Sequence, residues 1–187
     1  MTEGAALRHI VERLDSAGIA HMLAGSFAST YHGTPRATRD IDLVIDPARE
    51  SLDAFVAALP PEDFYVSHEA ARDAFARRSR FNVIDLASGW KFDLIIRKER
   101  PFSVEEFGRR ERAELFSVRV YVTSAEDTVI SKLEWPREGE SERQLRDVAG
   151  VAAVKGEDLD RGYIERWARE LGLVDLWQQA LELARET

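Results

Sequence analysis

Hydrophobic residues recur with two different patterns along this chain, and the change lies near residue 123. Before it, short apolar runs alternate with amphipathic stretches, which predicts strands interleaved with helices. After it, apolar residues recur at intervals of three and four, which predicts helices only. The pattern therefore predicts an α/β part over 1–123 and an all-helical part over 124–187.

The first part contains several periodic segments separated by breakers. We expect helices over 4–17, 48–59 and 68–78, a helical turn at 104–109, and strands over 19–24, 40–46, 81–86, 91–96 and 117–122. The strands at 81–86 and 91–96 are joined by a short segment containing Gly89, which is typical of a β-hairpin.

The second part begins its first two helices with capping-box-like sequences at Ser124 and Ser141. The first of these helices is expected to reach about Trp135. Two further helices are expected over 159–171 and 176–184, and their aromatic residues are expected to form packing contacts.

Composition narrows the class of protein. The chain has 187 residues, which suits one domain or one domain with a helical extension, and 44% of them are hydrophobic, which argues against a disordered chain. It has no cysteine, which excludes disulfides and agrees with a reducing, cytoplasmic location. Charges within the first 15 residues argue against a signal peptide. No apolar run approaches the roughly 20 residues that span a bilayer, so we expect no membrane partner.

The net charge of −8 argues against a general polyanion binder. The basic residues are nevertheless clustered, and the clusters are either solvated surface or a local rim for a phosphate-bearing substrate. They comprise Arg72, Arg77, Arg78 and Arg80, then Arg97, Lys98 and Arg100, then Arg109, Arg110 and Arg112.

Asp40 and Asp42 lie two residues apart on a predicted strand. Because side chains alternate along a strand, both carboxylates point to the same face. Such a pair is unfavourable unless a cation neutralises it, and Mg²⁺ prefers oxygen ligands of this kind. Two Mg²⁺ ions would stabilise the attacking and leaving oxygens of a phosphoryl displacement.

Asp93 offers a third carboxylate, because it interrupts an apolar strand in which Phe92, Leu94 and Ile96 share the opposite face. It is either a partner of the Asp40–Asp42 pair across the sheet or an acid at a strand edge. Asp85 is the rival third acid, although it lies nearer a turn.

Gly25 and Ser26 follow the first predicted strand. A glycine there lets the backbone approach a phosphate, and the Ser26 hydroxyl and the following N–H groups would bind phosphate oxygens. A Gly-Ser pair alone is weak evidence for a phosphate site. The evidence is stronger here, because thirteen residues later an Asp-x-Asp strand follows, and an isolated strand aspartate comes after that.

Residues 5–96 resemble the polymerase-beta-type nucleotidyltransferase superfamily through Leu23-Ala24-Gly25-Ser26 and Asp40-Ile41-Asp42. A closer resemblance is to bacterial nucleotidyltransferase-like proteins related to the AbiEii abortive-infection toxins. It is carried by Arg36-Ala37-Thr38-Arg39-Asp40-Ile41-Asp42, Gly89-Trp90-Lys91-Phe92-Asp93, Ser124-Ala125-Glu126-Asp127-Thr128-Val129-Ile130-Ser131-Lys132-Leu133 and Arg143-Gln144-Leu145-Arg146-Asp147-Val148.

The resemblance implies an α+β fold with a mixed sheet flanked by helices, followed by a C-terminal helical bundle that closes over the cleft. It implies that Asp40, Asp42 and Asp93 hold Mg²⁺ and that Asp93 serves as base. Gly25 and Ser26 would hold a nucleoside triphosphate.

The toxin-like resemblance adds two residues of the helical part. Lys132 would contact nucleotide phosphates, and Asp147 would position Lys132 or the nucleotide. The alternatives are an exposed helix lysine and an i,i+4 partner of Arg143. Arg39 is a further candidate for contact with the nucleotide, and the alternative is a solvated charge on a loop. The same two alternatives hold for Arg36.

These residues predict an enzyme that transfers a nucleoside monophosphate from a nucleoside triphosphate to a hydroxyl. The acceptor is RNA, in particular the 3′ end of tRNA, or a small molecule or protein. A toxin would have a cognate antitoxin as partner. The alternative is a catalytically inactive binding module that retains the fold.

Overall fold

The computed structural model describes residues 3–35, 37–38, 40–134 and 141–185. Its elements are α1 (Glu3–Ser16), β1 (Ala20–Leu23), α2 (Gly25–His32), β2 (Asp40–Asp46), α3 (Arg49–Ala57), β3 (Phe64–Val66), α4 (His68–Arg77), β4 (Arg80–Asp85), β5 (Lys91–Ile96), α5 (Pro101–Gly108), β6 (Glu111–Leu115), β7 (Val118–Val122), α6 (Ala125–Glu134), α7 (Ser141–Lys155), η1 (Gly156–Asp158), α8 (Arg161–Leu171) and α9 (Val174–Arg185).

The chain divides into two compact units. Unit 1 spans Met1–Leu23 and Arg39–Val122, and unit 2 spans Ala24–Thr38 and Thr123–Thr187. Residues 24–38, which lie within the predicted α/β part, therefore group with the C-terminal helices. The whole sheet belongs to unit 1.

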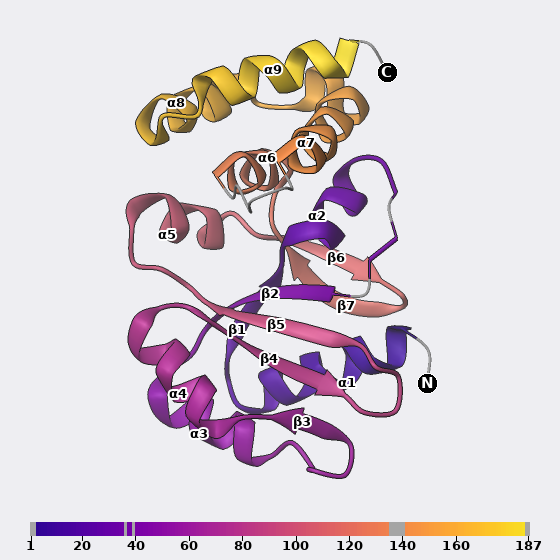
Figure 1. Cartoon of the computed structure of the whole chain (residues 1–187), viewed down its shortest axis with the longest axis vertical. Helices are drawn as coiled ribbons and strands as arrows, with labels where there is room; N and C mark the ends of the chain where they lie inside the picture. The colour runs from indigo at the N-terminus through magenta and orange to yellow at the C-terminus, as the bar shows by residue number, and fades with distance from the viewer. Residues whose placement is uncertain (1–2, 36, 39, 135–140, 186–187) are drawn as a thin grey trace. The chain divides into compact units, whose positions relative to one another are not determined.

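Unit 1 is built on a seven-stranded sheet with the order β3-β4-β5-β2-β1-β7-β6 (Figure 1). β2 pairs parallel with β5, and β1 pairs parallel with β7, while the other neighbours are antiparallel. α1 packs against β1 and β7, and α4 packs against β4 and β5. The predicted β-hairpin is confirmed as the antiparallel pair β4–β5.

β2 lies in the middle of the sheet, and its residues alternate between buried and less buried positions. Ile41, Leu43 and Ile45 are fully buried, while the residues between them are less buried. The apolar side chains therefore anchor β2 in the core, and the aspartates at alternate positions point to the other face.

Two strands were not predicted. β3 has only three residues, and β6 is mostly polar, with the sequence Glu-Arg-Ala-Glu-Leu. Both lie at an edge of the sheet, where one neighbouring strand and polar side chains suffice. The helix α5 is longer than the predicted turn at 104–109, because Pro101 provides a favourable first residue.

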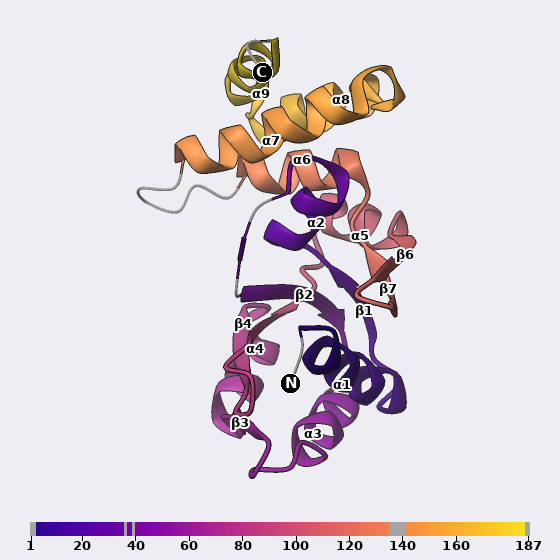
Figure 2. The same ribbon diagram turned by 90° about the vertical axis from the view of Figure 1, so that its right-hand side faces the viewer.

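Unit 2 consists of α2 and the helices from α6 to α9, seen from the side in Figure 2. The predicted cap of α6 is confirmed, because the Asp127 N–H donates to Ser124 Oγ at 3.1 Å and Ser124 Oγ donates to Asp127 Oδ2 at 2.6 Å. Tyr163 of α8 donates to Asp127 Oδ1 at 2.6 Å and so ties α8 to α6. The predicted end of α6 at Trp135 lies outside the described residues.

A close backbone approach joins α2 to α7. A Cβ added to Gly33 would lie 2.8 Å from the Val151 nitrogen and 3.0 Å from the Gly150 carbonyl carbon. Only a residue without a side chain fits this contact, which fixes the end of α2 on α7.

None of the helices in the described ranges combines the length and apolar composition that crossing a bilayer requires.

We expect Leu43→Ala to lower the free energy of unfolding by about 2–5 kcal/mol, because Leu43 is fully buried in the core of unit 1 and its truncation leaves a cavity. Val104→Ala is the control, since Val104 is exposed and its loss changes stability by less than about 0.5 kcal/mol. Urea denaturation followed by circular dichroism measures both. Equal stabilities for the two variants would contradict the placement of Leu43 in the core.

Candidate functional site

An acidic cluster forms where β2 and β5 begin side by side. The two strands are parallel, and their register pairs Asp42 with Asp93 and Asp40 with Lys91. Partners in adjacent strands point to the same face of a sheet. The structure therefore brings Asp40, Asp42 and Asp93 to one face, as the sequence predicted.

A lysine lies among these carboxylates. Lys91 Nζ is 3.3 Å from Asp40 Oδ1 and 3.4 Å from Asp93 Oδ2. Arg80 of β4 lies on the other side, with Nη1 3.9 Å from Asp93 Oδ2. The Asp93 side chain is only 5% exposed, whereas that of Asp40 is 56% exposed. The cluster thus runs from a buried acid to a solvent-accessible one.

One oxygen of Asp93 is unsatisfied. Asp93 Oδ1 is buried and has no hydrogen-bond partner, although its neighbour Oδ2 faces both cations. Burying a carboxylate oxygen without a partner is costly, and Asp93 Oδ1 is therefore an acceptor that a ligand would stabilise.

Carboxylate oxygens on one face, with one of them unsatisfied, fit a hard divalent cation. Within the described residues, however, no three His, Asp or Glu side chains are gathered closely enough to hold an ion as they stand. The Lys91 ammonium lies within ion-pair distance of both Asp40 and Asp93 and supplies positive charge there. The three aspartates are thus the residues with the oxygen ligands that Mg²⁺ prefers, and in this arrangement a lysine neutralises two of them.

The rival third acid, Asp85, has a different task. Its Oδ1 accepts hydrogen bonds from the Ser88 backbone N–H at 2.8 Å and from the Ser88 hydroxyl at 2.7 Å. Asp85 therefore holds the turn between β4 and β5, and it leaves Asp93 as the third carboxylate of the cluster.

Gly25 and Ser26 open α2 in unit 2. Gly25 has a φ of 58°, in the left-handed region where glycine is favoured. Ala24 is the N-cap residue and provides no side-chain cap. The N-terminal N–H groups of α2 therefore receive no hydrogen bond from the side chain of the N-cap residue.

Lys132 and Asp147 form a buried ion pair between α6 and α7 of unit 2. Lys132 Nζ donates to Asp147 Oδ2 at 2.7 Å, and the side chains are 7% and 11% exposed. The alternative of an exposed helix lysine is therefore wrong. The contact places Asp147 beside Lys132, and the roles of both residues toward a nucleotide stay predictions.

Several of the other basic residues form ion pairs, and two lie outside the described residues. Arg39 and Arg36 lie outside the described residues. In the predicted basic clusters, Arg72 pairs with Asp53, Arg77 with Asp73, Arg78 with Glu99 and Arg97 with Asp46. These pairs favour the interpretation of a solvated, locally neutralised surface.

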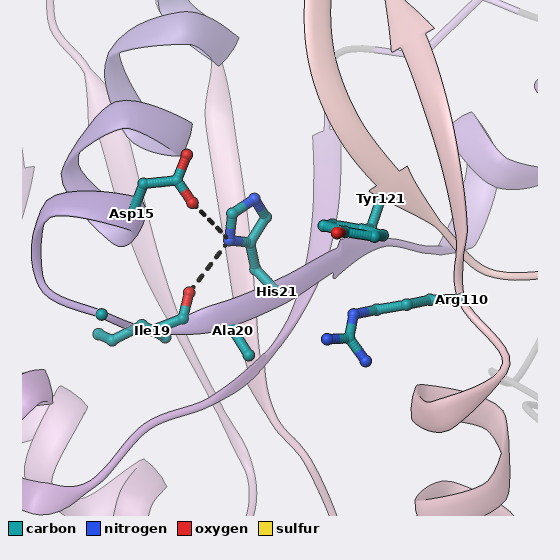
Figure 3. Close-up of a pocket in the computed structure, with 7 residues that line it drawn as sticks. Asp15, Ile19, Ala20, His21, Arg110 and Tyr121 are labelled. Atoms are coloured by element: carbon teal, nitrogen blue, oxygen red, sulfur yellow. Dashed lines mark hydrogen bonds and ion pairs between the residues drawn. The ribbon is translucent and has the colours of Figure 1, made fainter.

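A pocket of about 290 Å³ lies elsewhere in unit 1, and Figure 3 shows Arg110 beside Tyr121 in its wall. His21 Nδ1 donates to the Ile19 carbonyl at 3.1 Å. Arg112 donates to the Tyr121 hydroxyl, which lowers the pKa of Tyr121. The lining includes none of the three clustered aspartates, so the pocket is separate from the acidic cluster.

The sequence matched no known protein family and no curated protein sequence. Solved structures nevertheless resemble the chain. An antigenic nucleotidyltransferase-like protein from Paracoccidioides brasiliensis superposes with a TM-score of 0.58 at 16% identity, covering 95% of this chain and 91% of that one. The chain has a nucleotidyltransferase fold.

Two antibiotic-modifying proteins share the fold with this chain. ANT(2″)-Ia, solved with adenylyl-2″-tobramycin, has a TM-score of 0.57 at 14% identity, covering 91% of this chain and 97% of that one. The lincosamide antibiotic adenylyltransferase LnuA, solved with lincomycin, has a TM-score of 0.54 at 12% identity, covering 82% of this chain and 98% of that one. At such identities the likeness shows the fold.

Sequence reasoning did not place Lys91 or Arg80 beside the aspartates, although Arg80 belongs to one of the predicted basic clusters. The signal for Lys91 was present, because it precedes Asp93 by two residues and so shares its face. Arg80 comes from a separate strand, and only the β4–β5 pairing brings it near Asp93.

We expect Lys132→Met to lower the free energy of unfolding by about 3 kcal/mol, because it leaves the buried Asp147 without its cation. Arg146→Met is the control, and Arg146 lies on α7, the helix that carries Asp147. It removes an exposed pair with Glu142 and changes stability by less than about 1 kcal/mol. Thermal and urea unfolding distinguish the two; a Lys132 variant as stable as the control would show that the pair is not buried.

Proposed function

We propose that this protein is a Mg²⁺-dependent nucleotidyltransferase, which transfers a nucleoside monophosphate from a nucleoside triphosphate to a hydroxyl group. The observation that carries the proposal is the parallel register of β2 and β5, which sets Asp42 beside Asp93 on one face of a nucleotidyltransferase-fold sheet. Asp40, two residues from Asp42, extends the cluster toward solvent.

In the proposed reaction, the acceptor hydroxyl oxygen attacks the α-phosphorus of the triphosphate. The bond between the α-phosphorus and the oxygen that bridges it to the β-phosphorus breaks, and pyrophosphate leaves with that electron pair. The unsatisfied Oδ1 makes Asp93 the residue suited to accept the hydroxyl proton. Mg²⁺ bound by Asp40, Asp42 and Asp93 would neutralise the charge that develops on the phosphoryl and leaving oxygens.

The residues proposed to bind the triphosphate lie in unit 2. Gly25 and Ser26 would present the uncapped first turn of α2 to phosphate oxygens. Lys132 would add a point charge, and Asp147 would hold its ammonium in place through the 2.7 Å contact. Arg39 remains a proposed nucleotide contact on the basis of its position beside Asp40 in the sequence.

Two classes of acceptor follow from different observations. The likeness of the fold to two antibiotic adenylyltransferases supports a small-molecule hydroxyl. The motif resemblance to AbiEii-type toxins supports the 3′ end of tRNA, with a cognate antitoxin as partner. A panel that contains total tRNA, aminoglycosides and lincosamides separates these classes.

We expect the wild-type protein to transfer label from an α-³²P nucleoside triphosphate to an acceptor of this panel when Mg²⁺ is present. Asp42→Asn should lower the rate by roughly a thousandfold, which corresponds to about 4 kcal/mol of lost transition-state stabilisation. Asp46→Asn is the control, because Asp46 lies at the other end of the same strand and pairs with Arg97 at 3.0 Å.

Retained transfer in Asp42→Asn, or no transfer by the wild type to any acceptor, would contradict the assigned chemistry. Circular dichroism establishes that each variant is folded before its rate is compared.

A second candidate function is a non-catalytic module that keeps the fold. It is favoured by the position of Lys91, since an ammonium that permanently replaced the cation would leave the site inactive. Calorimetric titration with a nucleoside triphosphate and Mg²⁺ distinguishes the two, because only the enzyme requires Mg²⁺-dependent binding that is lost in Asp42→Asn.

A further inference from the structure

The acidic cluster of Asp40, Asp42 and Asp93 contains its own cation. Lys91 lies opposite Asp40 in the strand register and two residues before Asp93, so its side chain shares their face. Its Nζ lies at ion-pair distance from both acids, 3.3 Å and 3.4 Å away.

We propose that Lys91 is an internal counter-ion, which holds the place of a divalent cation between Asp40 and Asp93 and leaves it when that cation binds. This inference rests on the proposed function, because it takes the same aspartates as cation ligands. It adds that the metal-free protein is stabilised by a residue that competes with the metal.

The charges around Asp93 explain why a counter-ion is needed. Asp93 is almost fully buried, and its neighbour in register is another aspartate, so without a cation the two negative charges would destabilise the sheet. Arg80 contributes only a 3.9 Å contact from the other side. Lys91 thus supplies the closer of the two positive charges.

The form of the lysine side chain makes its departure possible. Lys91 is 35% exposed, so its flexible four-carbon stem has solvent on one side. Its contact with Asp40 is on an exposed carboxylate and is weak, since exposed pairs contribute about 0–1 kcal/mol. A divalent cation bound by the same oxygens would repel the ammonium into water.

If Lys91 competes with the cation, removing its charge should raise the affinity for the cation and lower the stability of the metal-free protein. Lys91→Met keeps the apolar stem and removes the charge. Mn²⁺, which binds the same hard oxygen ligands as Mg²⁺, should then bind about tenfold more tightly, because no ammonium opposes it. The metal-free variant should melt at a lower temperature than the wild type, and saturating Mn²⁺ should raise its melting temperature by more than it raises that of the wild type.

The control is Arg97→Met. Arg97 follows β5 and pairs with Asp46 of β2 at 3.0 Å, so this change removes one positive charge from the same strand pair at its other end. It should leave Mn²⁺ affinity within about twofold of the wild type, because its charge is not at the acidic cluster. Lys91→Met combined with Asp93→Asn should lose the gain in affinity.

The experiment titrates Mn²⁺ into the full chain without nucleotide, with free Mn²⁺ followed by electron paramagnetic resonance and melting followed in parallel. Tighter binding in Lys91→Met, with an unchanged control, supports the competition. Equal or weaker binding in Lys91→Met, alongside wild-type binding that depends on Asp93, overturns it and leaves the proposed function intact. Absence of Mn²⁺ binding in both wild type and Lys91→Met overturns both.

Discussion

The parallel pairing of β2 with β5 is the constraint on which the rest of the site depends. Parallel strands in register point matching residues to the same face, so Asp42 meets Asp93 and Asp40 meets Lys91. A shift by one residue would turn these carboxylates toward the core and bring Ile41 and Leu43 to the surface. The burial of the apolar residues in β2 therefore fixes the chemistry of the opposite face.

Local patterns were enough to predict the elements that make this pairing. The alternation in 40–46 predicted β2, and the apolar runs around Gly89 predicted the β4–β5 hairpin, because burial on one face imposes the spacing. The edge strands β3 and β6 were not predictable in this way, since short or polar edges carry little apolar pattern.

Local patterns likewise predicted some residues of the site and not others. Alternation placed Asp40 and Asp42 on one face, but only the register and the Ser88 contacts of Asp85 decided in favour of Asp93 as their partner. The Lys132–Asp147 pair joins two helices over fifteen residues, so no local spacing predicts it. The resemblance to toxin-like proteins was needed to single out these two residues.

Buried acids of this chain differ in how their oxygens are satisfied, and the difference separates structural from functional roles. Asp85 accepts from Ser88, and Asp127 accepts from Ser124 and Tyr163, so both carboxylates hold elements together. Asp93 keeps an unpartnered Oδ1, with the Lys91 ammonium beside its Oδ2. An unsatisfied buried oxygen costs stability, and the proposed cation would satisfy it. One strand register therefore brings together the buried acid, the neighbouring Asp42 and the lysine on which that proposal rests.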